Sequence, residues 1–235
     1  MNSEASNEKR TSPPPVAQSP SSFRMVSTMG AIGFVCGMLI VLTFQVTLPV
    51  ITKNKIEALE RAIFEVVPGA EQKTTFKLVD GELEPLEGEE DTAVKYYACY
   101  DGENHLVGVA LEASGQGFQD VLRILYGYSP EKQAVVGMKV LESKETPGLG
   151  DKIEKDPAFI ANFEALDVRL DDTGAKALNP IVLVKKGEKT DLWQIEAITG
   201  ATISSRAIAT ILEKSTAVTV PVISQNLTVL EDGAK

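Results

Sequence analysis

The sequence predicts an α+β domain that follows a single N-terminal transmembrane helix. The first observation is an uncharged run of 28 residues, 25–52, which is longer than the roughly 20 apolar residues that cross a bilayer. The second is a pair of strand-like runs around the Asp101-Gly102 turn, which is typical of a β-hairpin. The third is that further strands alternate irregularly with a few helical segments, which favours a mixed sheet.

Composition excludes several classes of protein. Of the 235 residues, 43% are hydrophobic and 24% charged, so the chain is not wholly disordered. The formal net charge of −10 argues against a surface that neutralises nucleic-acid phosphates. Two cysteines, Cys36 and Cys99, and one histidine, His105, are too few for a zinc site, for an iron-sulfur cluster ligated by this chain alone or for a disulfide framework. We therefore expect neither a metal nor a nucleic-acid partner.

Residues 25–52 are expected to form the transmembrane helix. A cleaved signal peptide is the alternative, but its apolar centre would cover only about 7 to 15 residues and end at small residues. Residues 1–24 are rich in Ser and Pro and are expected to be a disordered tail. Positive charges flank both ends of the span and do not decide its orientation, whereas long acidic domains are translocated regardless of local charge. We favour the domain on the outer side of the membrane.

Residues 53–92 are expected to form a membrane-proximal helix and an acidic loop. Ile56, Leu59, Ile63 and Val66 recur at helical spacing, and Pro68-Gly69 would end the helix. The acidic stretch 81–91 is expected to be an exposed loop.

Residues 93–216 are expected to form the main domain, and residues 217–235 a C-terminal tail. Within the domain the patterns predict strands and helices whose ranges are: strands 94–100, 105–113, 134–142, 181–184 and 191–198, and helices 156–166 and 203–214.

The stretch 199–205, Thr-Gly-Ala-Thr-Ile-Ser-Ser, lies between a predicted strand and a predicted helix. Its hydroxyls can cap that helix, whose free N–H groups and dipole favour a phosphate, and Gly200-Ala201 leaves room for a bulky ligand. The alternative is a plain cap, in which Thr202 or Ser204 only satisfies the helix end.

Two glycine-containing turns precede this stretch. Residues 145–150, Glu-Thr-Pro-Gly-Leu-Gly, follow a strand directly, and the glycines permit a flat ligand to lie against the backbone. Residues 115–118, Gly-Gln-Gly-Phe, follow another strand and are a weaker signal. Each can also be an ordinary turn.

Three motifs, GQGF from Gly115, ETPGLGDKI from Glu145 and TGATISS from Thr199, occur in an order that resembles a known family. The chain resembles the FMN-binding G subunit of Rnf-type ion-translocating electron transport complexes. That family is related to the C subunit of the sodium-translocating NADH:quinone reductase. The resemblance covers roughly residues 96–214 and the N-terminal anchor.

The resemblance implies a covalent cofactor. In that family the last Thr of the [ST]GAT motif carries FMN through a phosphoester bond, which a separate flavin transferase installs outside the cytoplasm; here it is Thr202. Two departures are Glu196, where the family usually has Asp, and Ser143, where it often has His. No catalytic residue is expected, and the implied cofactor-binding residues are Glu145, Thr146, Pro147, Gly148, Leu149, Gly150, Thr199, Gly200, Ala201, Thr202, Ser204 and Ser205.

For two further side chains, Arg206 and Trp193, the sequence leaves both a flavin-binding and a purely structural interpretation open. Arg206 can pair with the flavin phosphate or be a solvated surface arginine. Trp193 can stack on the flavin or pack in the core.

The implied function is a single-pass flavoprotein subunit of a translocase that relays electrons without independent catalysis. It would lie in the bacterial inner membrane, with its domain on the periplasmic side and other Rnf-type subunits as partners. A membrane-anchored redox sensor built on a similar FMN-binding domain is the main alternative. An anchored binding domain without flavin is the other.

Overall fold

The computed structural model describes residues 22–86, 88 and 94–233. It divides into two compact units after Lys53, and each unit is described by itself. The predicted tail 1–24 lies outside the described residues except for its last three, which are helical.

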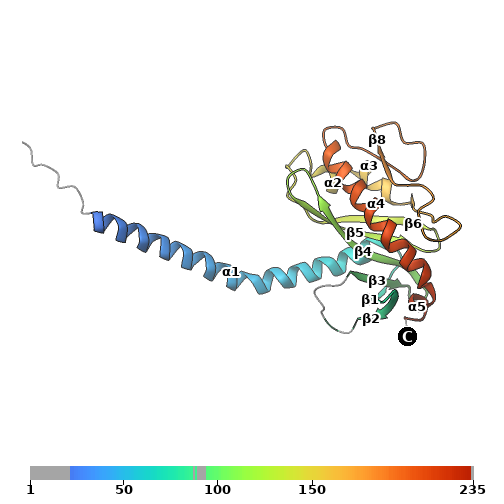
Figure 1. The fold of residues 1–235 in the computed structure, drawn as a ribbon, viewed down its shortest axis with the longest axis horizontal. Coiled ribbons are helices and arrows are strands. Elements are labelled where there is room, and N and C mark those ends of the chain that lie inside the picture. The colour runs from blue at the N-terminus through green and yellow to red at the C-terminus, as the bar shows by residue number, and fades with distance from the viewer. Residues whose placement is uncertain (1–21, 87, 89–93, 234–235) are drawn as a thin grey trace, which may run out of the picture. The chain divides into compact units, whose positions relative to one another are not determined.

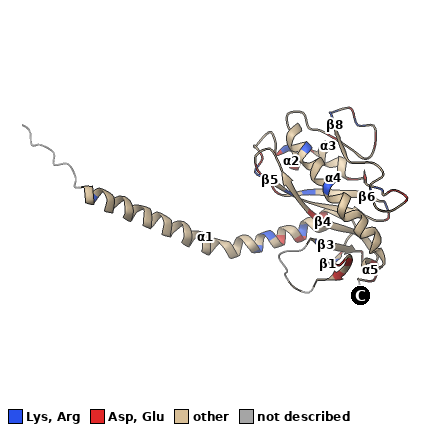
Figure 2. Cartoon of the chain, viewed as in Figure 1, with Lys and Arg blue, Asp and Glu red and all other residues tan. Residues whose placement is uncertain are grey.

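Helix α1, Ser22–Val66, contains the whole apolar run and continues into the charged stretch beyond it (Figure 2). Among the described residues two helices are long and apolar enough to cross a membrane, α1 and α4, Thr202–Gln225. Half of the apolar window of α4 is buried in the fold, whereas none of that of α1 is. The burial of α4 indicates a helix of the folded core. The candidate membrane span is therefore α1.

The second unit is built on a seven-stranded antiparallel sheet (Figure 1). The strand order is β2-β1-β3-β4-β5-β6-β7, so each strand from β3 to β7 pairs with its neighbour in sequence. A separate parallel pair, β8-β9, precedes α4. The strands are β1 Gln72–Val79, β2 Glu82–Pro85, β3 Lys95–Tyr100, β4 Leu106–Gln116, β5 Val121–Ser129, β6 Ala134–Glu142, β7 Leu166–Asp167, β8 Val182–Val184 and β9 Gln194–Glu196.

Short helices complete the unit. Between β6 and β7 lie α2, Lys152–Lys155, α3, Pro157–Ile160, and the 3-10 turn η1, Ala161–Phe163. Asp156 caps α3 by accepting a hydrogen bond from the N–H of Ala158, and Pro157 occupies the first helical position. The last described helix is α5, Leu227–Asp232.

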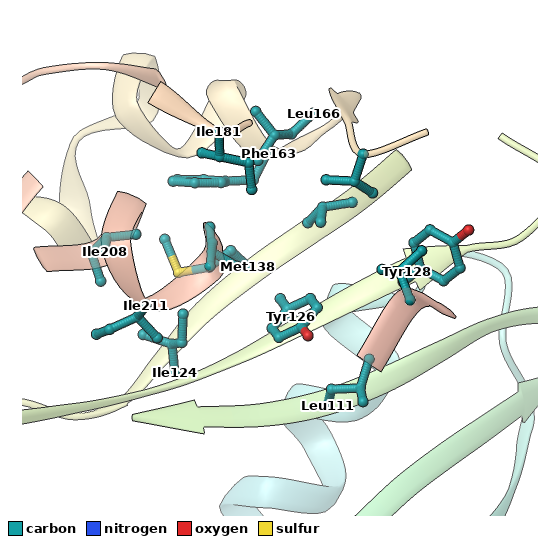
Figure 3. Packing of buried hydrophobic residues seen from close by; sticks show 14 of the residues in the cluster. Leu111, Ile124, Tyr126, Tyr128, Met138, Phe163, Leu166, Ile181, Ile208 and Ile211 are labelled. Carbon is teal, nitrogen blue, oxygen red and sulfur yellow. The ribbon is translucent and has the colours of Figure 1, made fainter. Parts of the chain in front are cut away.

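The two faces of the sheet are covered by different helices. Successive side chains of a strand point to opposite faces, and in β3 this places Tyr96 and Tyr100 with α4, but Tyr97 and Cys99 with the end of α1. The larger core lies on the α4 side, where Figure 3 shows side chains of β4, β5 and β6 meeting those of α4 and of the segment that contains η1. The N-terminus of α4 is thereby held at one end of this core.

The end of α1 lies against two glycines that face each other across β5 and β6. A Cβ at Gly127 would overlap the carbonyl oxygen of Val66, and one at Gly137 would lie 2.6 Å from the same oxygen. No real side chain tolerates such distances, so only glycine admits the helix backbone here.

The structure confirms the mixed α+β class, the β3-β4 hairpin, β6 and the helix after residue 202. It differs from the sequence prediction for residues 53–92, where β1 and β2 form a hairpin in addition to the expected helix, and β2 buries Leu83 between exposed glutamates. The predicted tail 217–235 is instead helical as far as Asp232. The apolar spacing of α4 continues through Val220 and Ile223, both fully buried, and this extends the helix into the core.

Candidate functional site

A pocket of about 330 Å³ lies where the loops after β4 and β6 meet the N-terminus of α4. Its size falls at the lower end of the range for small-molecule sites, about 300 to 1,000 Å³. The three segments are far apart in sequence and carry the three motifs noted above. The lining residues are Phe118, Glu145, Thr146, Leu149, Gly150, Gly200, Ala201, Thr202, Ile203 and Ser204.

The N-terminus of α4 is open toward this pocket. Gly200 has a φ of +85°, a conformation that glycine adopts without strain, and Ala201 at the N-cap provides no side-chain cap. Within the described residues no acceptor is found for the N–H groups of residues 202–204. These donors and the positive end of the helix dipole suit a phosphate.

Two serines after Thr202 fasten the start of the helix. Ser205 is fully buried; its Oγ donates to the carbonyl of Ala201 at 2.9 Å and accepts from the N–H of Ile198 at 3.2 Å. Ser204 is also buried and donates to Glu145. Neither Thr202 nor Ser204 caps the helix, so the plain-cap interpretation does not describe this structure. Thr202 is exposed and lines the pocket.

The loop after β6 is a tight turn. The N–H of Leu149 donates to the carbonyl of Thr146 at 3.1 Å, and Gly148 takes a φ of +77°. The amide nitrogen of the Gln119 side chain donates to Thr146 Oγ1 at 3.0 Å, which joins this turn to the loop after β4.

An apolar rim surrounds the pocket. Phe118, Leu149 and Ile203 are each more than half exposed, at 57%, 52% and 57%. They come from the three different segments, so a flat apolar ligand placed there would contact all three. Exposed apolar groups that gather around a pocket favour a ligand or a partner.

An ion pair ties the loop after β4 to the loop after β6. Lys144 Nζ donates to the carboxylate of Asp120, and this hydrogen bond lowers the pKa of Asp120 and raises that of Lys144. Both side chains are solvated, so the pair adds little stability.

The structure brings eight of the twelve predicted cofactor-binding residues to the pocket. Pro147, Gly148, Thr199 and Ser205 do not line it. Sequence reasoning did not include Phe118 and Ile203 among the site residues. Phe118 ends the GQGF motif and Ile203 follows Thr202, so their places within or beside the motifs could have indicated that they line the pocket.

The residues with two interpretations lie outside the pocket lining. Arg206 is exposed, one turn after Thr202, and pairs with no acidic side chain among the described residues. Trp193 is half-buried and is not a member of the core clusters.

The two residues that depart from the family pattern also lie outside the pocket lining. Ser143 Oγ accepts the N–H of Glu145 at 3.2 Å and faces a neighbouring charged groove. Glu196 lies in β9 with its N–H bonded to Asn162.

Sequence comparison finds G subunits of ion-translocating complexes among the proteins similar to this chain. Residues 117–217 match the FMN-binding domain family. The G subunit of an ion-translocating oxidoreductase complex from Methanosarcina acetivorans is 29% identical over 197 residues, which cover 82% of this chain and 91% of the relative. The G subunit of a proton-translocating ferredoxin:NAD(+) oxidoreductase complex from Clostridium ljungdahlii is 26% identical over 188 residues. These residues cover 80% of this chain and 86% of that relative.

Solved structures agree on the fold. NqrC from Shewanella oneidensis superposes with a TM-score of 0.57 at 18% identity, covering 77% of this chain and 98% of that one. The C subunit of the sodium-translocating NADH-quinone reductase from Parabacteroides distasonis gives 0.50 at 21% identity, covering 67% and 80%. The chain therefore resembles the G subunit of Rnf-type ion-translocating oxidoreductase complexes over most of its length, and its residues 117–217 match the FMN-binding domain family on a fold similar to that of NqrC.

Proposed function

We propose that this protein is a membrane-anchored flavoprotein subunit that carries FMN on Thr202 and relays electrons within an ion-translocating complex. The observation that carries the proposal is the position of Thr202, an exposed residue at the open N-terminus of α4 that lines a pocket with an apolar rim. Bound FMN would supply the redox chemistry, and the protein would supply its position and surroundings.

The residues fit both ends of an FMN molecule. The unpaired N–H groups of residues 202–204 can donate to the phosphate, and the rim of Phe118, Leu149 and Ile203 can cover the ring system. In the attachment step Thr202 Oγ1 would lose its proton and bond to the phosphorus in the FMN half of FAD, while the pyrophosphate bond breaks and AMP leaves. Free FMN is a poor donor for this transfer, because its phosphate could release only hydroxide. A separate flavin transferase would catalyse that step.

The apolar part of α1 would anchor the protein in the bacterial inner membrane as a single pass, with the FMN-binding domain on the periplasmic side. Covalent attachment suits that location, because a dissociable cofactor would be lost where free FMN is scarce. The partners would be the other membrane subunits of an Rnf-type complex, as the names of the relatives suggest.

Denaturing gel electrophoresis tests the proposal. The full chain, coexpressed with a flavin transferase, is expected to give a fluorescent flavin band at its own mobility. A chain that never fluoresces would favour an anchored binding domain without flavin. Copurification from native membranes separates the remaining two functions: electron-transport subunits should accompany a relay subunit, whereas a redox sensor would be isolated without them.

Gly200→Val is expected to prevent flavin loading while the rest of the fold is kept. A β-branched residue disfavours a φ near +85°, and its methyl groups would stand at the mouth of the pocket, although no protein atom lies within 4 Å of the Cβ position. Gly200→Asn is the control, because Asn tolerates this conformation better and should keep partial loading. Flavin fluorescence per chain measures both. Normal loading in the Val variant would contradict the need for a small residue.

A further inference from the structure

Glu145 is the side chain that joins all three segments of the pocket. One carboxylate oxygen, Oε1, accepts the N–H groups of Phe118 at 2.7 Å and Gln119 at 3.2 Å. The other, Oε2, accepts the hydroxyl of Ser204 at 2.5 Å. The loop after β4, the loop after β6 and the first turn of α4 are thus held by a single carboxylate.

Two glycines leave the space that this carboxylate occupies. A Cβ at Gly117 would lie 2.5 Å from Oε1, and a Cβ at Gly150 would lie 2.5 Å from Oε2. Neither glycine has the positive φ that would otherwise explain its presence. At Gly150 the nearest atoms all belong to Glu145 and its partner Ser204, whereas at Gly117 the backbone carbonyl oxygen of Asp120, at 2.8 Å, excludes a Cβ as well.

The carboxylate is held by neutral donors. Glu145 is 6% exposed, and no Lys, Arg or His among the residues described here lies within 4.0 Å of its oxygens. Burying a carboxylate without a cation is costly unless hydrogen bonds compensate for the lost water. The three donors from two other segments supply that compensation, so the side chain and the two segments hold one another in place.

The first turn of α4 has reason to depend on this contact. An N-cap without a side-chain acceptor leaves the start of a helix weakly held, and Ala201, the N-cap residue of α4, has no such acceptor. Ser204 lies in that turn, two residues after Thr202, and Glu145 is its partner.

We propose that Glu145 is a positioning residue, which sets the two loops and the first turn of α4 before flavin arrives and thereby holds Thr202 ready for FMN transfer. Only the part of the proposal that concerns Thr202 and FMN transfer rests on the proposed function. The other part, in which Glu145 fastens the two loops and the first turn of α4, concerns the protein without flavin and can be tested separately.

Hydrogen exchange on the flavin-free full chain tests the fastening. In Glu145→Ala the amides of Phe118 and Gln119 lose their acceptor and should exchange at least about tenfold faster than in the wild type. The amide of Ser205, whose hydrogen bond to the carbonyl of Ala201 closes the first turn of α4, should exchange faster to a similar extent, because Ser204 has lost its partner. Glu145→Gln should restore most of the protection. Its side chain has almost the same volume, its amide oxygen can accept both backbone N–H groups, and its amide nitrogen can donate to Ser204 Oγ.

Initial rates of FMN loading by a flavin transferase from FAD test the consequence. Glu145→Ala should lower kcat for loading by about tenfold or more, because a misplaced acceptor group costs rate at that scale, while the KM for FAD stays unchanged. Glu145→Gln should recover most of the rate. The matched control is Glu154→Ala, an exposed glutamate of α2 with no ion pair among the described residues, which should load and exchange as the wild type does.

FMN loading of the wild type separates failure of the proposed function from failure of the positioning role of Glu145. If the wild type does not load, the proposed function fails, and the exchange experiment still decides whether Glu145 fastens the loops. If the wild type loads and Glu145→Ala loads equally fast, or its amides keep their protection, the positioning role is wrong. Equal losses in Glu145→Gln and Glu145→Ala would also overturn it, because the amide keeps the hydrogen bonds and removes only the charge.

Discussion

Thr202→Val is expected to abolish flavin attachment completely while the chain remains folded. Valine has nearly the shape of threonine but no hydroxyl, so no oxygen remains at this position to bond the FMN phosphorus. The side chain is exposed at the pocket, and its loss leaves no buried polar group unpaired. In-gel flavin fluorescence and the intact mass of the chain measure the effect, and thermal unfolding shows that the fold is kept.

Thr210→Val is the matched control for that variant. It makes the same substitution in the same helix, two turns further on, outside the pocket that Thr202 lines. It should load flavin as the wild type does. Covalent flavin that survives in Thr202→Val would show that another residue is the acceptor, whereas equal loss in Thr210→Val would mean that valine disturbs α4 itself.

Gly127→Ala is expected to destabilise the domain by about 3 kcal/mol or more, which lies at the upper end of the usual cost of overpacking. Its Cβ would overlap the carbonyl oxygen of Val66 and stand 2.8 Å from its carbonyl carbon. Both are backbone atoms, so the end of α1 must move away from the sheet, together with the buried Ile63 and Val66. Thermal unfolding of the detergent-solubilised full chain should show a drop of several degrees in Tm.

Gly102→Ala provides the comparison for the second prediction. There a Cβ would meet only the carboxylate of Glu71, at 2.9 Å, and this flexible side chain can turn away. We expect a change within about 0.5 kcal/mol, as for most surface substitutions. A Gly127→Ala protein as stable as the wild type would contradict the close contact between α1 and the sheet.

Much of the fold could be predicted because its signals are local. The Asp101-Gly102 turn between two apolar runs predicted the β3-β4 hairpin, and Asp156-Pro157 predicted the start of α3. The β1-β2 hairpin has a similar signal in Asp80-Gly81, where both residues have positive φ, but the surrounding glutamates favoured a loop. Strand β5 was not predicted at all.

The site was predictable in part for the same reason. Motif order pointed to the segments around Glu145 and Thr202, and the structure brings those segments together. Their mutual contacts were not predictable, because the bond between Glu145 and Ser204 spans 59 residues and has no local signature. Ser205 illustrates the converse: its hydroxyl fits the motif, yet it is buried and fastens the backbone of Ala201 and Ile198 instead of lining the pocket.

Mass spectrometry of the full chain, purified after coexpression with a flavin transferase, tests the central claim most directly. Trypsin should release residues 190–206 as one peptide, which contains Thr190, Thr199, Thr202, Ser204 and Ser205 as competing hydroxyls. The account predicts one FMN phosphoester per chain, located on Thr202 by fragmentation. An FMN on any other residue, or an unmodified peptide from a chain exposed to an active transferase, would contradict it.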